Sequence, residues 1–296
     1  FYFLKSTCQR RMMKGTSGRR NQPSEVRGMS VVTGLLLSLI GFAAGAYGIM
    51  VGAGGGFIFV PALLILLHLP PEMAAGTGLV VVFINSISGI YGYIRQKRID
   101  FKMGFLLALG ATPGTFLGIW LTKLASPKAF HSVFAIMLVA LGIFLMIKKA
   151  PGNQRKASDS QNEVAATIDR HTSPDMVKTP SQAVSLLVIG IVLGVVSSFF
   201  GIGGGWLLVP ILIYLFRVHP HYATAISIFS LCLYSLVGVI IHIVQNNIDW
   251  PAAIWGSVGI FIGAQVGVYL STRISGKRIL QMLAAVLILV GIKLAI

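Results

Sequence analysis

Two glycine triplets are the residues of this chain best suited to bind a solute. They are Gly54, Gly55 and Gly56 in the first half and Gly203, Gly204 and Gly205 in the second. Each triplet comes directly before a short apolar segment. The first N–H groups of a helix have no partner within it, and the aligned peptide dipoles place about half a positive charge there. Because glycine has no side chain, a solute can approach these groups closely. The triplets therefore predict an anion site made of backbone.

Polar side chains within the apolar segments could complete such a site, because hydroxyl and amide groups donate hydrogen bonds to anion oxygens. The candidates are Asn85, Ser86, Ser227, Tyr234 and Ser235, with Thr115 and Gln265 beside a stripe of glycines. The alternative for each is a hydrogen bond to its own helix or to a neighbouring helix. The sequence leaves both open.

Residue types that carry enzymatic or metal chemistry are missing from the apolar segments. All eight acidic residues lie in loops, at helix ends or in polar segments, and the two cysteines form no metal-binding or disulfide pattern. HExxH, GxSxG and phosphate-loop motifs do not occur. We therefore expect no enzymatic activity, no cofactor and no metal. The lack of acidic residues in the apolar segments also gives no indication of a metal-cation path.

The composition places these residues in a membrane. Hydrophobic residues make up 55% of the chain and charged residues 11%, whereas about a quarter of residues are charged in soluble proteins. Residues 29–51 and 73–94 are uncharged and long enough to cross a bilayer as helices. The predicted fold class is an all-α, multi-pass protein of the cell membrane. The net charge of +16 comes largely from a basic N-terminal stretch and short loops, so we expect no nucleic-acid partner.

The apolar unit occurs twice, because residues 52–61 return as residues 201–210 with the same offset throughout. Each copy divides into five apolar segments, at about 31–51, 57–68, 73–94, 103–121 and 129–147, and at about 183–200, 206–216, 222–244, 251–271 and 279–296. The second segment of each copy is too short to cross. Twelve helical residues reach about 18 Å, against about 30 Å of hydrocarbon. Each repeat should therefore contain one half-helix that is broken off by glycine.

These segments predict four parts of the chain. Residues 1–28 are a polar leader, or an addition to the native chain, and residues 29–148 form the first transmembrane repeat. Residues 149–182 are a polar linker, and residues 183–296 form the second repeat. An odd number of segments predicts repeats inverted across the membrane, and equivalent loops differ in basic charge as this requires. If the short segments only dip in and return, the repeats would be parallel instead.

Two further patterns predict structural roles. Glycines recur at every fourth position in Gly110, Gly114 and Gly118, and again in Gly259, Gly263 and Gly267. Small residues at this spacing let two membrane helices pack closely. Asp100 and Asp249 precede the fourth segments and should cap those helices.

The GxGGG pattern followed by Val-Pro, present twice, resembles the sulfite exporter TauE/SafE family. The Ile-Asp-aromatic triplets that begin at Ile99 and Ile248 also resemble it, and the resemblance covers about residues 31–296 without the linker. It implies secondary transport, often export, of small sulfur-containing anions such as sulfite or organosulfonates (sulfoacetate).

With two glycine-broken halves, such a transporter would work by alternating access. Its partners would be a small anionic substrate and the lipid bilayer. A coupling ion (H+ or Na+) and a homo-oligomeric state are left open. The alternatives are an anion channel and a membrane scaffold that transports nothing.

Overall fold

The computed structural model describes residues 30–147, 180–274 and 276–295. Every regular element within these ranges is an α-helix. The predicted leader, residues 1–28, lies outside the described residues, as does most of the predicted linker, residues 149–182.

The helices follow the two predicted sets of five segments. The first half contains α2 (Val31–Val51), α3 (Gly56–Leu66), α4 (Pro71–Arg95), α5 (Phe101–Leu124) and α6 (Pro127–Ile147). The second half contains α8 (Pro180–Phe200), α9 (Gly205–Tyr214), α10 (Pro220–Val244), α11 (Trp250–Ser271) and α12 (Gly276–Ala295). Because α8 begins at Pro180, it includes the last residues that the sequence assigns to the linker.

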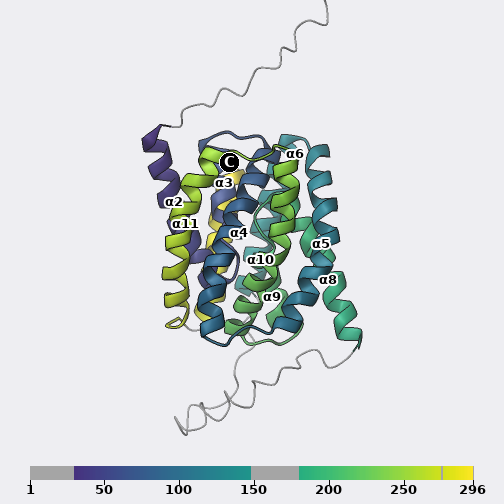
Figure 1. Ribbon diagram of the computed structural model, residues 1–296. Coiled ribbons are helices and arrows are strands. Elements are labelled where there is room, and N and C mark those ends of the chain that lie inside the picture. Colours follow the sequence, from purple (N-terminus) through teal and green to yellow (C-terminus); the bar gives the residue numbers. More distant parts are fainter. Residues whose placement is uncertain (1–29, 148–179, 275, 296) are drawn as a thin grey trace, which may run out of the picture.

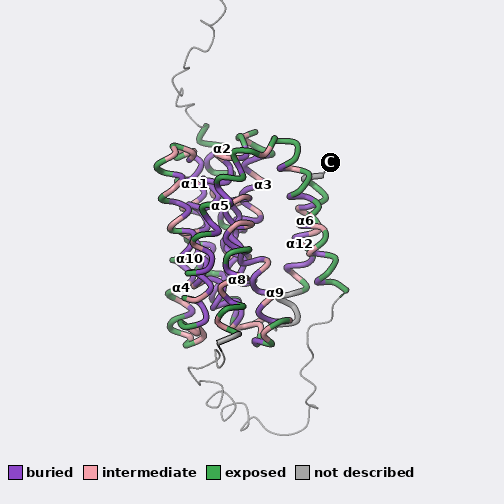
Figure 2. Tube along the Cα trace, turned by 90° about the vertical axis from the view of Figure 1, so that its right-hand side faces the viewer, coloured by how far each residue is buried: buried purple, intermediate pink, exposed green. Residues whose placement is uncertain are grey.

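Seven of the described helices are long and apolar enough to cross a membrane: α2, α4, α5, α6, α8, α10 and α11. The half-helices α3 and α9 are shorter, as is the described apolar part of α12, Gln281–Lys293. Figure 2 shows buried residues gathered inside the bundle and exposed residues along its outer faces. Many of the exposed side chains are large and apolar, which suits a surface covered by lipid. The prediction of an all-helical, multi-pass membrane protein is confirmed.

The two halves interlock, because the first helix of each packs along the fourth helix of the other. Thus α2 lies against α11, and α8 lies against α5. The third helices, α4 and α10, pack together between these pairs, and α6 pairs with α12 along one side of the bundle (Figure 2). Neither half could keep its packing without the other.

The glycine stripes lie in these exchanged interfaces. A Cβ atom on Gly114 would overlap the backbone carbonyl oxygen of Ile191 on α8. A Cβ atom on Gly263 would overlap the equivalent carbonyl oxygen, of Phe42 on α2. The other stripe glycines meet backbone carbonyls in the same way, so the predicted role in close helix packing is confirmed.

The predicted helix caps are also present. Oδ1 of Asp100 accepts a hydrogen bond from the Met103 N–H at 3.1 Å, and Oδ1 of Asp249 accepts one from the Ala252 N–H at 3.0 Å.

The inverted sense of the repeats stays a prediction. In Figure 1, α2 begins at the upper end of the bundle and α8 begins at the lower end.

Candidate anion-binding site

The two glycine triplets meet inside the bundle, where α3 and α9 begin. A Cβ atom on Gly56 would lie 2.5 Å from the carbonyl oxygen of Ile202, next to the second triplet. A Cβ atom on Gly205 would overlap the carbonyl oxygen of Gly52, next to the first. All residues of both turns, 52–56 and 201–205, are buried. The structure therefore brings together the two helix starts that the sequence singles out.

Glycine is required in these turns by backbone conformation as well as by space. The φ angles are +79° at Gly52, +81° at Gly54, +69° at Gly201 and +74° at Gly203. The left-handed region costs other L-residues roughly 1–2 kcal/mol each. These angles reverse the chain between a spanning helix and a half-helix within a few residues.

Two apolar side chains lie between the middle parts of the turns, at Gly54 and Gly203. Val82 on α4 and Leu231 on α10 hold equivalent positions in the two repeats, and both lie against Gly54 and Gly203. The space directly between these two glycines is therefore filled in this conformation. Sequence reasoning missed both side chains because their apolar character marks them as core. The repeat offset, which relates one to the other, was the available signal.

Asn85 on α4 faces the start of α3. Its side chain is fully buried, and neither Oδ1 nor Nδ2 has a hydrogen-bond partner. Nδ2 would lie 3.2 Å from a Cβ atom on Gly55, the N-cap residue of α3. Among the described residues, no hydrogen bond engages the N–H groups of Gly55, Gly56 or Phe57. A buried amide without partners is rare in proteins, because leaving it unpaired costs about 1–3 kcal/mol.

Tyr234 on α10 holds the position equivalent to Asn85, and it faces the start of α9. Its hydroxyl accepts a hydrogen bond of 2.8 Å from the N–H of Gly204, the N-cap residue. The tyrosine is 2% exposed. The second helix start therefore has an internal partner for its N-cap N–H, whereas the first has none.

Three other predicted site residues form hydrogen bonds to backbone. The Ser227 hydroxyl donates to the Gly52 carbonyl at 2.8 Å, which ties α10 to the first turn. Thr115 donates to Ala111 on its own helix, and Ser235 donates to Cys232 on its own helix. For Thr115 and Ser235, the structure shows the alternative of local bonding that the sequence left open.

The last two predicted residues lie in different environments. Gln265 is exposed on α11, and its Nε2 donates to the carbonyl and the hydroxyl of Ser88 on α4, at 2.9 and 2.8 Å. Ser86, next to Asn85 in sequence, is fully buried, and its hydroxyl has no partner. The structure thus bonds Tyr234 and Ser227 to the turns and places the unpartnered Asn85 beside one of them. Gln265 instead bonds between two helices.

Sequence reasoning gave no binding role to two further buried groups. The indole Nε1 of Trp206, in the first turn of α9, has no hydrogen-bond partner. His242, near the end of α10, is 1% exposed, and both of its ring nitrogens lack partners. No cluster of metal-binding side chains was found among the described residues.

The buried polar side chains of the described residues are neutral hydroxyls, one amide and one imidazole, and they include no lysine, arginine, aspartate or glutamate. Positive potential at the glycine turns must therefore come from the backbone. The half-helices α3 and α9 both place their N-termini there. Each end carries about half a positive charge, so together they equal about one elementary charge.

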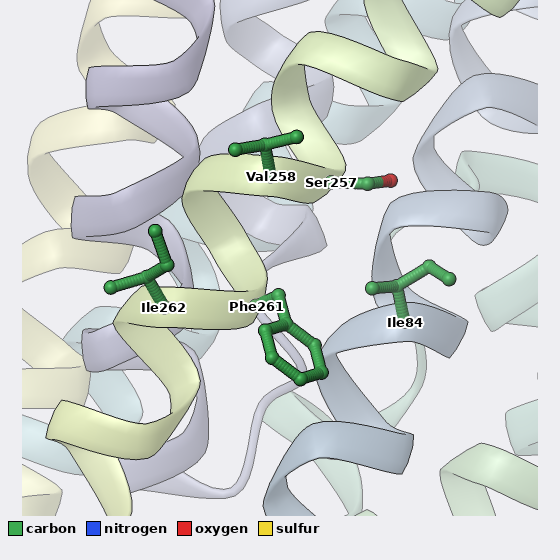
Figure 3. Close-up of a pocket in the computed structure, with 5 residues that line it drawn as sticks. All are labelled: Ile84, Ser257, Val258, Phe261 and Ile262. Carbon is green, nitrogen blue, oxygen red and sulfur yellow. The ribbon is translucent and has the colours of Figure 1, made fainter.

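A groove on the outside of the bundle differs from these turns. It runs between α4 and α11, where it is lined by Ile84, Ser257, Val258, Phe261 and Ile262 (Figure 3). Three of the five side chains are more than half exposed and apolar. A surface of this kind suits lipid chains, and we assign no solute to it.

Comparison with known proteins agrees with the pattern around the turns. A family model described as sulfite exporter TauE/SafE matches residues 37–294. The chain belongs to this family. The match includes both glycine turns and all thirteen predicted site residues.

Curated relatives that match over most of their length are named as probable transporters. YunE of Bacillus subtilis (strain 168), a "probable membrane transporter protein", is 29% identical over 267 residues, which cover 88% of this chain and 96% of the relative. MJ0441 of Methanocaldococcus jannaschii, with the same description, is 27% identical over 272 residues, 87% and 93% of the two chains. No solved structure gives a significant match. The chain is therefore a multi-pass membrane transporter, in accord with the expectation that it is not an enzyme.

Proposed function

We propose that this TauE/SafE member is a secondary transporter, of the exporting kind, for small sulfur-containing anions such as sulfite or organosulfonates (sulfoacetate). The observation that carries the proposal is the meeting of two half-helix N-termini inside the bundle, with the unpartnered amide of Asn85 at one of them. The sulfur chemistry rests on the description of the family.

The turns suit an anion for electrostatic reasons. Free N–H groups at a helix start donate hydrogen bonds to anions, and the peptide dipoles favour negative charge. Non-helical backbone at membrane depth is tolerated only where it lines a cavity or is buried in protein. Close packing alone would require glycine only where helices touch. A binding site also explains why each repeat has a helix broken by a glycine turn.

We further propose that the solute is exposed alternately to the two sides. Both turns are buried, so this conformation corresponds to an occluded state. The central helices α4 and α10 carry the side chains that cover the turns, Val82 and Leu231, and those that face the helix starts, Asn85 and Tyr234. Movement of α4 and α10 relative to α3 and α9 would uncover the site. The opposite starting ends of α2 and α8 support inverted repeats (Figure 1), which are common in such transporters.

Flux measurements on purified protein in liposomes test the transport mechanism. We expect sulfite flux to saturate and to speed up when unlabelled sulfite is present on the opposite side. Flux that rises linearly without this acceleration would indicate a channel instead. A complete lack of flux with sulfite and with sulfoacetate would contradict anion transport.

Replacement of Asn85 tests the location of the site. Asn85→Ala should lower kcat/KM for sulfite by roughly 10- to 100-fold, because a hydrogen bond to a charged group contributes about 1.5–3 kcal/mol. Ser230→Ala is the matched control. Ser230 is also buried in a central helix, but its hydroxyl donates to Ile226 on the same helix at 2.9 Å. Equal transport by the two variants, at equal amounts of folded protein, would remove Asn85 from the site.

A further inference from the structure

The surroundings of the first glycine turn also favour one charge state of the solute. This inference rests on the proposed function. We propose that the first glycine turn takes a singly charged oxyanion that still carries a proton, such as hydrogen sulfite, and disfavours the corresponding dianion. Asn85 would contact this anion through both atoms of its amide.

The positive potential at the turns is limited to about one charge. The dipoles of α3 and α9 each supply roughly half an elementary charge. The buried polar side chains among the described residues add no lysine or arginine. A dianion at this place would keep about one uncompensated charge in a low-dielectric interior, which is strongly unfavourable. A single negative charge is matched by the two helix ends.

The amide of Asn85 offers one donor and one acceptor, and both are unpartnered. Its Nδ2 group can donate to an anion oxygen beside Gly55. Its Oδ1 atom needs a donor, which a fully deprotonated oxyanion lacks. A protonated oxyanion has one O–H group and several acceptor oxygens, so it can satisfy both amide atoms. The side chain thus favours an anion that keeps its proton.

Among the described residues, none of the atoms closest to the first glycine turn belongs to a group that would titrate in place of the solute. The side chains or backbone atoms that meet Gly54, Gly55 and Gly56 belong to Ala44 on α2, Val82 and Asn85 on α4, Ile202 before α9 and Leu231 on α10. Titratable side chains lie farther away on the neighbouring helices. Tyr47 on α2 has its ring 6.3 Å from that of Phe57, Tyr234 on α10 is bonded to Gly204, and α10 also carries Cys232 and, beside Gly76 of α4, His242. A pH dependence of binding should therefore follow the protonation of the anion.

Thermal melting of the purified full chain in detergent can test this with three probes. For sulfite, the apparent Kd calculated from the total sulfite concentration should rise about tenfold for each pH unit once the dianion predominates. The Kd calculated from the concentration of hydrogen sulfite alone should stay constant. Methanesulfonate, a monoanion without a proton, should bind about tenfold more weakly and with no pH dependence. Sulfate, a dianion throughout, should give no shift in melting temperature.

The Asn85→Leu variant separates the amide from the helix dipoles. We expect it to bind hydrogen sulfite and methanesulfonate equally weakly, because the group that distinguishes them is gone. Equal binding of sulfite at every pH, or binding of sulfate as tight as that of sulfite, would overturn the inference and leave anion transport intact. If no probe binds at any pH and sulfite flux is also absent, the proposed function itself fails.

Discussion

The two glycine turns share a sequence pattern and a place in their repeats, yet their helix starts differ. Gly55, the N-cap of α3, has a φ of +74°, whereas Gly204, the N-cap of α9, has a φ of −75°. The Gly204 N–H is bonded to Tyr234, while the amide of Asn85 in the equivalent position has no partner. The two copies therefore share a sequence pattern but differ in backbone conformation and in hydrogen bonding at the helix start.

This difference indicates that the two glycine turns have different roles. A helix start whose N-cap N–H is already bonded can hold its shape without a solute. A helix start beside an unpaired amide gains most when a solute arrives, because the cost of leaving the amide unpaired is then removed. We therefore expect changes at the first turn to affect transport and changes at the second turn to affect mainly stability.

The largest expected effect comes from adding a methyl group to Gly55, and the same change at Gly204 provides the comparison. Gly55→Ala should lower the free energy of unfolding by about 2–5 kcal/mol, since it combines a positive φ with overpacking against backbone. Its Cβ would lie 2.7 Å from the Ala44 carbonyl oxygen. Gly204→Ala keeps an ordinary φ and meets the Tyr234 hydroxyl at 2.9 Å, so the cost should be about 1 kcal/mol.

Melting temperatures followed by tryptophan fluorescence would rank these two variants. A Gly55→Ala protein that melts at or above the temperature of Gly204→Ala would contradict the backbone difference between the turns. The same reasoning makes a bulkier residue at Gly55 a poor probe of transport, because it would disturb folding first.

A second pair of variants sharpens the comparison where the halves are alike. Gly114→Ala and Gly263→Ala each place a methyl group against a backbone carbonyl of the neighbouring helix, which cannot rotate away. Each should cost about 1–3 kcal/mol, as overpacking does. Thermal melting should give nearly equal losses for the two. A loss in only one variant would show that the exchanged interfaces are less equivalent than their contacts indicate.

A smaller effect is expected from Tyr234→Phe. This change leaves the buried Gly204 N–H without an acceptor and should cost about 1–2 kcal/mol of stability. Sulfite transport should stay within a few-fold of the original. The matched control is Tyr93→Phe, since the Tyr93 hydroxyl donates to the Ile49 carbonyl at 2.7 Å. That carbonyl keeps a second partner, the Gly52 N–H, so the control should lose less.

Melting and flux of these two variants, measured together, complete the test. If Tyr234→Phe abolished transport while leaving the melting temperature unchanged, the second turn would hold the solute, and the division between the halves would be reversed.

Features set by local spacing could be predicted from the sequence. The caps at Asp100 and Asp249 follow from an acidic residue directly before a helix, and the glycine stripes follow from a period of four. The half-helices were also predictable, because a segment of twelve residues cannot cross hydrocarbon. These features depend on neighbours within a turn or two of the same helix.

The partners of buried polar groups could not be predicted in this way. Asn85 and Tyr234 belong to one class of candidates in the sequence, but only the structure separates the free amide from the bonded hydroxyl. Thr115 could point into a site or bond to its own helix, and Gln265 could face inward or bridge to α4. The choice depends on which helices lie alongside, and those helices come from the other repeat.

By itself, the sequence determined that this chain is a duplicated membrane protein with a glycine-broken half-helix in each copy. Hydropathy, helix length and the conformational freedom of glycine are properties of short stretches of sequence, so they can be inferred without knowledge of the tertiary structure. The tertiary structure alone decided that the halves exchange their first helices, that the two turns touch, and that one N-cap is bonded while the other is not. Those outcomes depend on contacts such as that between Ser227 and Gly52, which join residues far apart in the chain.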